Sequence, residues 1–395
     1  MKNKSVLSTI LFFSILNFPF HSISAQIQVQ SGISHAYDDN PFRLVEPEAN
    51  WISTLDLGLQ YDFSKVSLSY EGSFTRFDRL MERNFYWHQI SVFGTGEKIN
   101  WSLSLDESFN GTDYDIYNQT AAGVSVDYQF KFRLFTLSGS GSFIYNYYPQ
   151  LKDINNYFAH TDLQIRKSLP TRTTIIGGVG ISYKYYPYSV TTETPQLSLY
   201  PVLSIKDGGY GGGFGGGTGG YSGAYQIYTS AETPYAAQMQ LWIRLAQSVF
   251  SKTGVAVQYL RWISLSGYNR SITGVIYDYN DESAIFDDPL GYELQSVHSE
   301  FTQLLPFQSM LKIGYDFGDK NYTTQGIYTS ELAYSDSVFR VDNNKYLSIS
   351  LQKYFMVGKM LLNVELLYQW LYNNSNSYWY NYKSGNMAVL LNWHF

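Results

Sequence analysis

The chain has 395 residues, of which 44% are hydrophobic and 15% charged, and its formal net charge is −6 at pH 7. That acidic balance argues against nucleic acid as a partner. Cysteine is absent, which excludes a disulfide framework and a lipid anchor on an N-terminal cysteine.

The beginning of the sequence has the pattern of a secretory signal peptide. Lys2 and Lys4 precede an apolar run over residues 6–20, and small residues follow up to Ala25. A transmembrane helix is the alternative, but it needs about 20 apolar residues, and Ser, Asn and Pro interrupt this shorter run. We therefore expect a signal peptide at residues 1–25 and one exported domain at residues 26–395.

Strand-like alternation fills the rest of the chain. In STLDLGLQYDF, every second residue from Leu55 to Phe63 is apolar, and polar residues stand between them. A period of two is strand geometry, because successive side chains point to opposite faces. The same pattern predicts about sixteen strands (within roughly 14–18), near residues 27–37, 51–63, 66–77, 85–94, 98–108, 120–130, 133–147, 156–168, 171–186, 236–250, 253–266, 296–305, 308–320, 344–355, 358–372 and 385–395.

The connections between these segments alternate between short and long. Short turns fall at 64–65, 94–98, 131–132, 169–170, 251–252, 306–307 and 356–357, and longer loops at 38–50, 78–84, 109–119, 148–155, 187–235, 267–295, 321–343 and 373–384. Such sorting is typical of outer-membrane barrels, which have short periplasmic turns and long extracellular loops. We therefore predict an all-β fold, a closed antiparallel transmembrane β-barrel in the outer membrane of a Gram-negative cell.

The last strand, NMAVLLNWHF, must pair with the first, because an open edge in lipid leaves backbone groups without hydrogen bonds. Its alternation resembles the C-terminal signal that the barrel-assembly machinery reads in bacterial outer-membrane proteins. That resemblance implies an assembly signal and makes the machinery and the membrane lipid expected partners; the signal would consist of Met387, Val389, Leu391, Trp393 and Phe395.

A second resemblance lies within the first 110 residues. There YDDNPFRL, from Tyr37 to Leu44, is followed by a hairpin and then by NFYWHQISVFG. These segments resemble a loosely defined family of bacterial β-barrel porins, some of which are associated with exopolysaccharide export. The resemblance implies a pore that passes hydrophilic solutes or a surface polysaccharide.

If the apolar alternates face lipid, the other face lines the lumen. Its charged members are the pore-lining candidates: Asp56, Glu71, Asp106, Asp127, Asp162, Arg166, Lys184, Arg244, Glu300, Lys312, Asp316 and Glu365. Gln60, His160, Gln240, Asn363 and Gln369 share this face. A sixteen-stranded barrel leaves an aqueous channel, whose selectivity such charges set. Alternatively, these groups only solvate the lumen.

Two other function classes stay open. A surface adhesion or scaffold barrel would act through its loops and would not conduct. An outer-membrane hydrolase would need His160 or His298 beside a nucleophile at the rim. The histidines have no metal-ligand spacing, and no HExxH or CxxC pattern occurs. We therefore expect no enzyme, metal or cofactor.

Three loop segments carry unusual compositions. The tract from Gly208 to Gly223 is mostly glycine and lacks the strand–turn–helix context of a dinucleotide site. Asp281, Glu282, Asp287 and Asp288 form an acidic loop, either solvated or calcium-binding. The segment NNSNSYWYNY places Tyr378, Trp379, Tyr380 and Tyr382 among amides, which suits an interfacial belt or a sugar site.

Overall fold

The computed structural model describes residues 26–150, 152–187, 235–266, 288–330, 333–358 and 360–394. Several predicted features lie outside these residues: the signal peptide at 1–25, the glycine tract, and the side chains of Asp281, Glu282, Asp287 and Phe395. None of the helices in the described part of the chain is long and apolar enough to cross a membrane.

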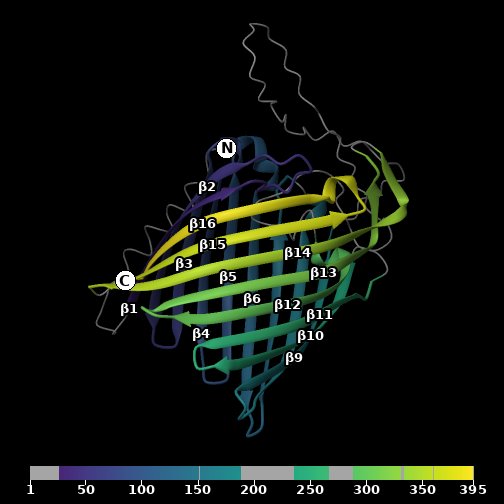
Figure 1. Ribbon diagram of the computed structural model, residues 1–395. Coiled ribbons are helices and arrows are strands. Elements are labelled where there is room, and N and C mark those ends of the chain that lie inside the picture. Colours follow the sequence, from purple (N-terminus) through teal and green to yellow (C-terminus); the bar gives the residue numbers. More distant parts are fainter. Residues whose placement is uncertain are drawn as a thin grey trace.

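The described chain forms one closed sheet of sixteen antiparallel strands (Figure 1). Each strand pairs with its neighbours in sequence, which confirms the predicted closed all-β barrel. The strands are β1 (Gln26–Asp38), β2 (Asn50–Phe63), β3 (Val66–Phe77), β4 (Phe85–Thr95), β5 (Ile99–Asn110), β6 (Gln119–Lys131), β7 (Thr136–Tyr147), β8 (Asn156–Ser168), β9 (Thr173–Tyr185), β10 (Tyr235–Phe250), β11 (Thr253–Ser264), β12 (Tyr292–Leu305), β13 (Ser309–Tyr328), β14 (Tyr334–Val357), β15 (Met360–Ser375) and β16 (Tyr382–His394).

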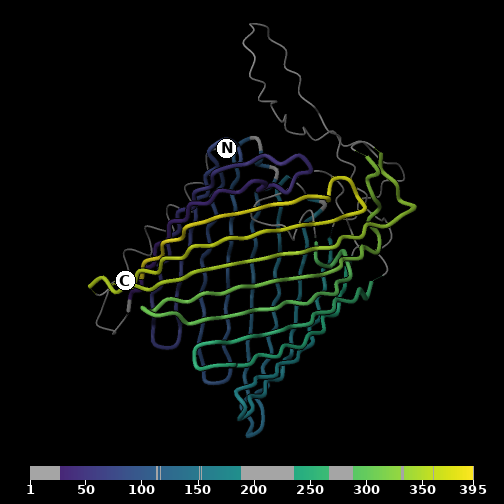
Figure 2. Tube along the Cα trace, viewed as in Figure 1, coloured from purple at the N-terminus to yellow at the C-terminus, as the bar shows by residue number. Residues whose placement is uncertain are grey.

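The first and last strands close the ring. β1 pairs with β16 in an antiparallel register that sets Ile33 opposite Leu391 and Gln30 opposite His394. Figure 2 shows this seam, where the yellow end of the trace runs beside the purple beginning. Closure leaves no strand edge open along the seam, as a lipid-exposed sheet requires.

Tight turns join the strands at one end of the barrel. β2 and β3 are linked by Ser64 and Lys65 alone, and Ser64 has a φ of 52°. Phe307 and Gln308, between β12 and β13, have φ of 59° and 57°. Left-handed backbone lets such short turns follow the twist of the flanking strands.

The opposite end carries the longer connections. Within the described residues, five of these connections contain a short 3-10 helix; four of the helices are single turns, and η2 has six residues. These helices are η1 (Met81–Arg83), η2 (Thr112–Tyr117), η3 (Lys152–Ile154), η4 (Pro289–Gly291) and η5 (Tyr378–Tyr380). One predicted loop was wrong. Most of residues 321–343 extends β13 and β14 into a long hairpin, with register shifts between Asn321 and Ile327. These shifts break the period of two, so the alternation was not visible in the sequence.

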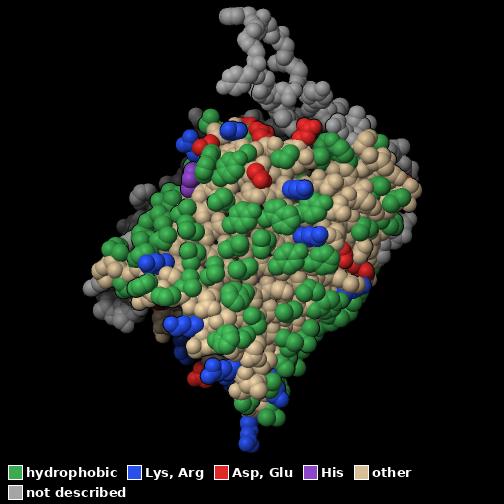
Figure 3. Space-filling view, in the orientation of Figure 1, with side chains coloured by type: hydrophobic (Ala, Val, Ile, Leu, Met, Phe, Trp, Pro, Cys, Tyr) green, Lys and Arg blue, Asp and Glu red, His purple; other side chains and the backbone are tan. Residues whose placement is uncertain are grey.

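The two faces of the barrel wall differ in chemistry. Exposed large apolar side chains occupy alternate positions, as in β2, where Leu55 is 54% and Leu57 46% exposed. The other face of the same strand carries Asp56 and the buried Ile52. In the space-filling view, hydrophobic side chains dominate the outer surface of the front strands, and charged ones interrupt them only in places (Figure 3).

Aromatic side chains gather on the outer face near the loop end. Tyr145, Tyr157, Tyr185 and Tyr235 stand directly opposite one another on β7–β10. The ring centroids of Tyr145 and Tyr157 are 4.7 Å apart, and those of Tyr157 and Tyr185 are 6.4 Å apart. Such a row has the composition of the aromatic girdle that lies at the membrane–water interface.

Candidate functional site

The strand registers place the pore-lining candidates on one continuous face. Residues directly opposite on neighbouring strands point to the same side of a sheet. Glu71 is opposite Gln89, which is opposite Asp106. Farther round, Arg244 is opposite Gln258, then His298 and then Asp316. The remaining candidates follow the same parity: Asp56, Asp127, Asp162, Arg166, Lys184, Glu300, Lys312 and Glu365, together with Gln60, His160, Gln240, Asn363 and Gln369.

This shared face is the inner one. It carries the buried apolar residues Ile52, Phe77 and Phe85, whereas the exposed apolar residues occupy the opposite parity. Small residues leave room on it for longer neighbours. A Cβ at Gly178 would lie only 2.5 Å from Trp242 Cε2, so the indole of β10 lies across β9 at that glycine.

One wall of the interior, on β2–β5, is lined by carboxylates and neutral amides. Gln89 donates to Asp106 at 2.5 Å. At the turn end of β2, Asp62 accepts bonds from Ser67 at 2.6 Å and from Gln60 at 2.8 Å. These contacts orient the carboxylates without cancelling their charge.

The opposite wall pairs its charges. Arg244 Nη2 on β10 lies 3.3 Å from Glu300 Oε1 on β12. His298 Nδ1 lies 2.7 Å from Asp316 Oδ1, and its Nε2 lies 4.0 Å from Glu300 Oε2. Acids and bases therefore alternate at contact distance across β10, β12 and β13.

Lys184 lies on the inner face but is covered. Its Nζ lies 2.5 Å from Asp288 Oδ2, and the two side chains are only 7% and 12% exposed. Tyr186 donates to the same carboxylate at 3.2 Å, and Gln238 donates to the Pro289 carbonyl at 2.6 Å. The ion pair therefore anchors η4 to the wall, and Asp288 is engaged there rather than free in an acidic loop.

The β1–β2 loop, which holds the YDDNPFRL segment, fastens the seam at the barrel mouth. Asn40 is fully buried and donates to the carbonyls of Leu44 and Lys383, each at 2.8 Å. Asp39 accepts from the Gly385 amide at 2.6 Å. The loop therefore connects the first strand to the last across the closure point.

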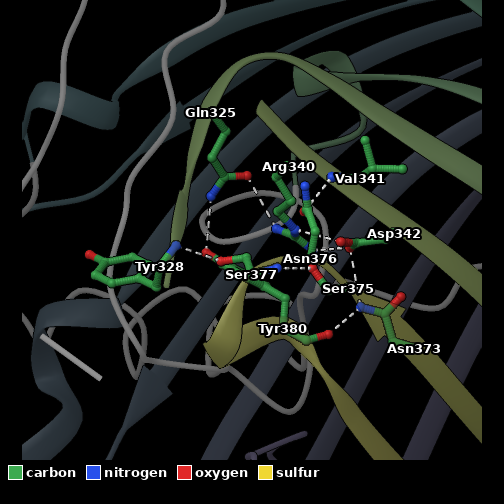
Figure 4. Close-up of polar contacts among 10 residues, drawn as sticks. All are labelled: Gln325, Tyr328, Arg340, Val341, Asp342, Asn373, Ser375, Asn376, Ser377 and Tyr380. Carbon is green, nitrogen blue, oxygen red and sulfur yellow. Dashed lines mark hydrogen bonds and ion pairs between the residues drawn. The ribbon is translucent and has the colours of Figure 1, made fainter. Parts of the chain in front are cut away.

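A second fastening lies between the β13–β14 hairpin and η5 (Figure 4). Arg340 is 2% exposed and Asp342 is 0% exposed. Arg340 donates through Nε to Asp342 Oδ1 at 2.9 Å, through Nη2 to the other carboxylate oxygen, and through Nη1 to Gln325 Oε1 at 3.2 Å. Its guanidinium carbon lies 3.3 Å from the ring centroid of Tyr380.

This contact changes the interpretation of the aromatic segment near residue 380. Tyr380 is only 3% exposed and packs on Arg340, so it belongs neither to a belt nor to a sugar site. Tyr378 and Trp379 contact each other edge to face, with ring centroids 5.0 Å apart.

His160 and His298, the two histidines considered for a hydrolase, are poorly placed for catalysis. His160 Nδ1 lies 2.9 Å from Ser182 Oγ, but Ser182 is only 1% exposed and cannot meet a substrate in this state. His298 is held between Asp316 and Glu300. Within the described ranges, no group of three or more His, Cys, Asp or Glu side chains could hold a metal ion.

Comparisons with known proteins agree with this architecture. No family profile and no curated protein matches the sequence. Among solved structures, OccAB1 of Acinetobacter baumannii matches with a TM-score of 0.51 and 8% identity over 94% of this chain and 96% of that one. OccK1 (OpdK) of Pseudomonas aeruginosa matches with a TM-score of 0.48 and 8% identity, covering 94% of this chain and 98% of that one. A bacterial polysaccharide outer-membrane secretin gives 0.48 and 7%, covering 93% and 97%.

At such low identity these matches show the fold alone, and only the first reaches a TM-score above 0.5. The closed ring, the apolar exterior and the aromatic row are the features of a protein of the bacterial outer membrane. Sequence reasoning missed the two mouth fastenings, at Asn40 and at Arg340. Polar residues inside otherwise irregular segments were the only signal for them.

Proposed function

We propose that this protein is an outer-membrane channel that passes hydrophilic solutes. The observation that carries the proposal is the polar inner face, which continues from strand to strand around a closed sixteen-stranded ring. Rings of this size leave an aqueous interior. Ser, Gln and Asn side chains between the charged groups supply hydrogen-bond partners for water and for solutes.

Swelling of liposomes that contain the refolded protein tests the proposal. Vesicles with the barrel should swell in isotonic solutions of small sugars and more slowly as sugar size increases. Vesicles that hold the heat-denatured protein are the control. Absence of swelling with the folded barrel, even for the smallest sugar, would favour the non-conducting adhesion or scaffold barrel instead.

Passage of a surface polysaccharide remains a finer prediction of the sequence resemblance. The same assay addresses it, because a path for a polysaccharide chain must also admit long oligosaccharides. A sharp size limit at the level of mono- or disaccharides would argue against it.

A further inference from the structure

Charge is unevenly distributed around the barrel interior. The inner face of β1–β7 carries several carboxylates. Among the described strand residues of this face, Lys131, at the last position of β6, is the single base. The carboxylates of this wall, called the acidic wall here, are Asp38, Asp56, Asp62, Glu71, Asp106 and Asp127.

The hydrogen bonds to the acidic wall come from neutral donors, so no neighbouring cation in the described part of the chain cancels its charge. Gln89 binds Asp106, and Ser67 and Gln60 bind Asp62. Asp38 accepts from Ser384 and from Asn386, each at 3.1 Å. Unlike a paired lysine or arginine, a neutral donor brings no opposite charge and leaves the field of an ionised carboxylate in the lumen.

On β8–β13 the charges are arranged differently. Lys184 is matched by Asp288 and Arg244 by Glu300. Lys320 Nζ lies 4.5 Å from the ring centroid of Tyr292. Three of the bases of this wall therefore stand beside an acid or an aromatic ring, and Arg166 and Lys312 face the same interior as Asp162 and Asp316. Positive and negative charges nearly balance here.

From this asymmetry we infer that the channel selects cations over anions, with the acidic wall as the preferred path. The inference rests on the proposed channel function and goes beyond it by naming the charge class of the solute. A carboxylate about 10 Å from a passing monovalent ion in water changes the local ion concentration about twofold at low salt. Several carboxylates on one wall multiply this effect, and chloride is depleted correspondingly.

Loop residues add charges of both signs at the mouth. The basic ones include Arg43 and, in η1, Arg83. Arg83 lies over two aromatic rings, 4.3 Å from the centroid of Phe42 and 3.9 Å from that of Tyr114. The strand-borne acidic wall, by contrast, extends from Asp38 at the mouth to Asp62 beside the turn end. It therefore acts over most of the length of the path.

The reversal potential in a planar bilayer tests the inference. A gradient of potassium chloride is placed across a membrane that holds the refolded full chain, and the potential at zero current is read. Cation selectivity predicts a potential of the sign set by potassium. Conducting channels with zero potential, or with the sign set by chloride, would overturn the inference and leave the channel standing. Folded protein that does not conduct would overturn both.

Two variants locate the effect. Asp56→Asn, Glu71→Gln and Asp106→Asn combined should lower the local potassium concentration about eightfold at low salt and raise that of chloride by the same factor, from about twofold per charge, so the potassium-to-chloride permeability ratio should fall about 60-fold. The matched control is Glu107→Gln, because Glu107 neighbours Asp106 on β5 but points to the outer face, opposite His88. It should leave the ratio unchanged. An unaltered ratio in the triple variant, with the barrel shown to be folded by its gel mobility, would show that this wall does not set selectivity.

Discussion

Replacing Arg340 should loosen the extracellular end of the β13–β14 hairpin. Its guanidinium binds Asp342 with two nitrogens and Gln325 with the third, and it lies between the rings of Tyr322 and Tyr380, 4.1 and 3.3 Å from their centroids. Asp342 is 0% exposed and also accepts from Asn373 at 3.2 Å. The substitution Arg340→Ala removes every one of these contacts of the guanidinium.

The cost follows from what remains. Asp342 would be a buried carboxylate without its countercharge, and breaking such a pair costs about 3–5 kcal/mol. The lost stacking on two rings is part of the same change, since a desolvated cation–π contact is worth about 2 kcal/mol or more and such terms do not add simply. Arg340→Lys should fall between, because one ammonium cannot reproduce the planar fork.

Hydrogen exchange of the refolded barrel measures this locally. The Val341 amide donates to Asn376 Oδ1 at 2.8 Å, and the Tyr328 amide donates to Ser377 Oγ at 3.0 Å. Both amides report whether the hairpin and the β15–β16 connection stay together. With Arg340→Ala they should exchange about 10²-fold to 5×10³-fold faster, the equivalent of about 3–5 kcal/mol.

Two further variants test whether the unpaired charge of Asp342 causes the faster exchange. Replacing both partners, Arg340→Met with Asp342→Leu, leaves no buried unpaired charge, so most of the protection should return. The control Lys345→Ala lies on the outer face of β14 and should change exchange by less than a factor of about three. Unchanged exchange in Arg340→Ala, or a double variant that exchanges faster than either single one, would refute this account of the cluster.

Three more predictions concern the thermal stability of the barrel and the accessibility of its two ends on intact cells. Asn40→Ala should lower the temperature at which the folded band converts to the unfolded band on a gel, because it removes the bonds across the seam, whereas Glu46→Ala in the same loop should not. A single cysteine at Glu46 should react with a membrane-impermeant maleimide on intact cells, and one at Lys252 should not; reversed labelling would contradict the orientation. Gly178→Leu should also lower the conversion temperature by displacing the facing indole on β10, while Gly177→Leu, on the outer face, should be tolerated; equal effects would contradict the close packing.

The barrel itself could be predicted because its wall has one chemical requirement at every strand. Outward positions are mostly apolar and inward positions mostly polar, so strands such as β2 and β15 are visible without any knowledge of their partners. The alternation of short and long connections then fixed antiparallel order and an even strand number. Apart from the closing pair of β1 and β16, strand order needed no long-range information, because each strand pairs with its neighbours in sequence.

The mouth could not be predicted in the same way. Asn40 contacts the carbonyl of Lys383 across 343 positions of sequence, and Lys184 contacts Asp288 across 104. No periodicity links such residues, because the contacts depend on the path of the loops and not on strand alternation. Lys184 shows the consequence: its inward position followed from the alternation, but its burial beneath η4 did not.

The sequence predicted which side chains lie on the inner face, but not what they do there. Parity placed Asp56, Arg244 and Asp316 on the inner side, and the registers agree. Which charges are matched and which are not depends on distances across strands, as in the pair of Arg244 with Glu300 at 3.3 Å. The role of these residues as a pore lining remains a prediction.

Ion conductance through a planar bilayer shows whether the folded barrel is an open channel. Refolded protein whose folded state is verified by gel mobility is added to one side of the membrane at fixed voltage. The channel account predicts discrete, lasting current steps, one for each inserted barrel. A membrane that holds folded barrels and shows no steps at any voltage would contradict it.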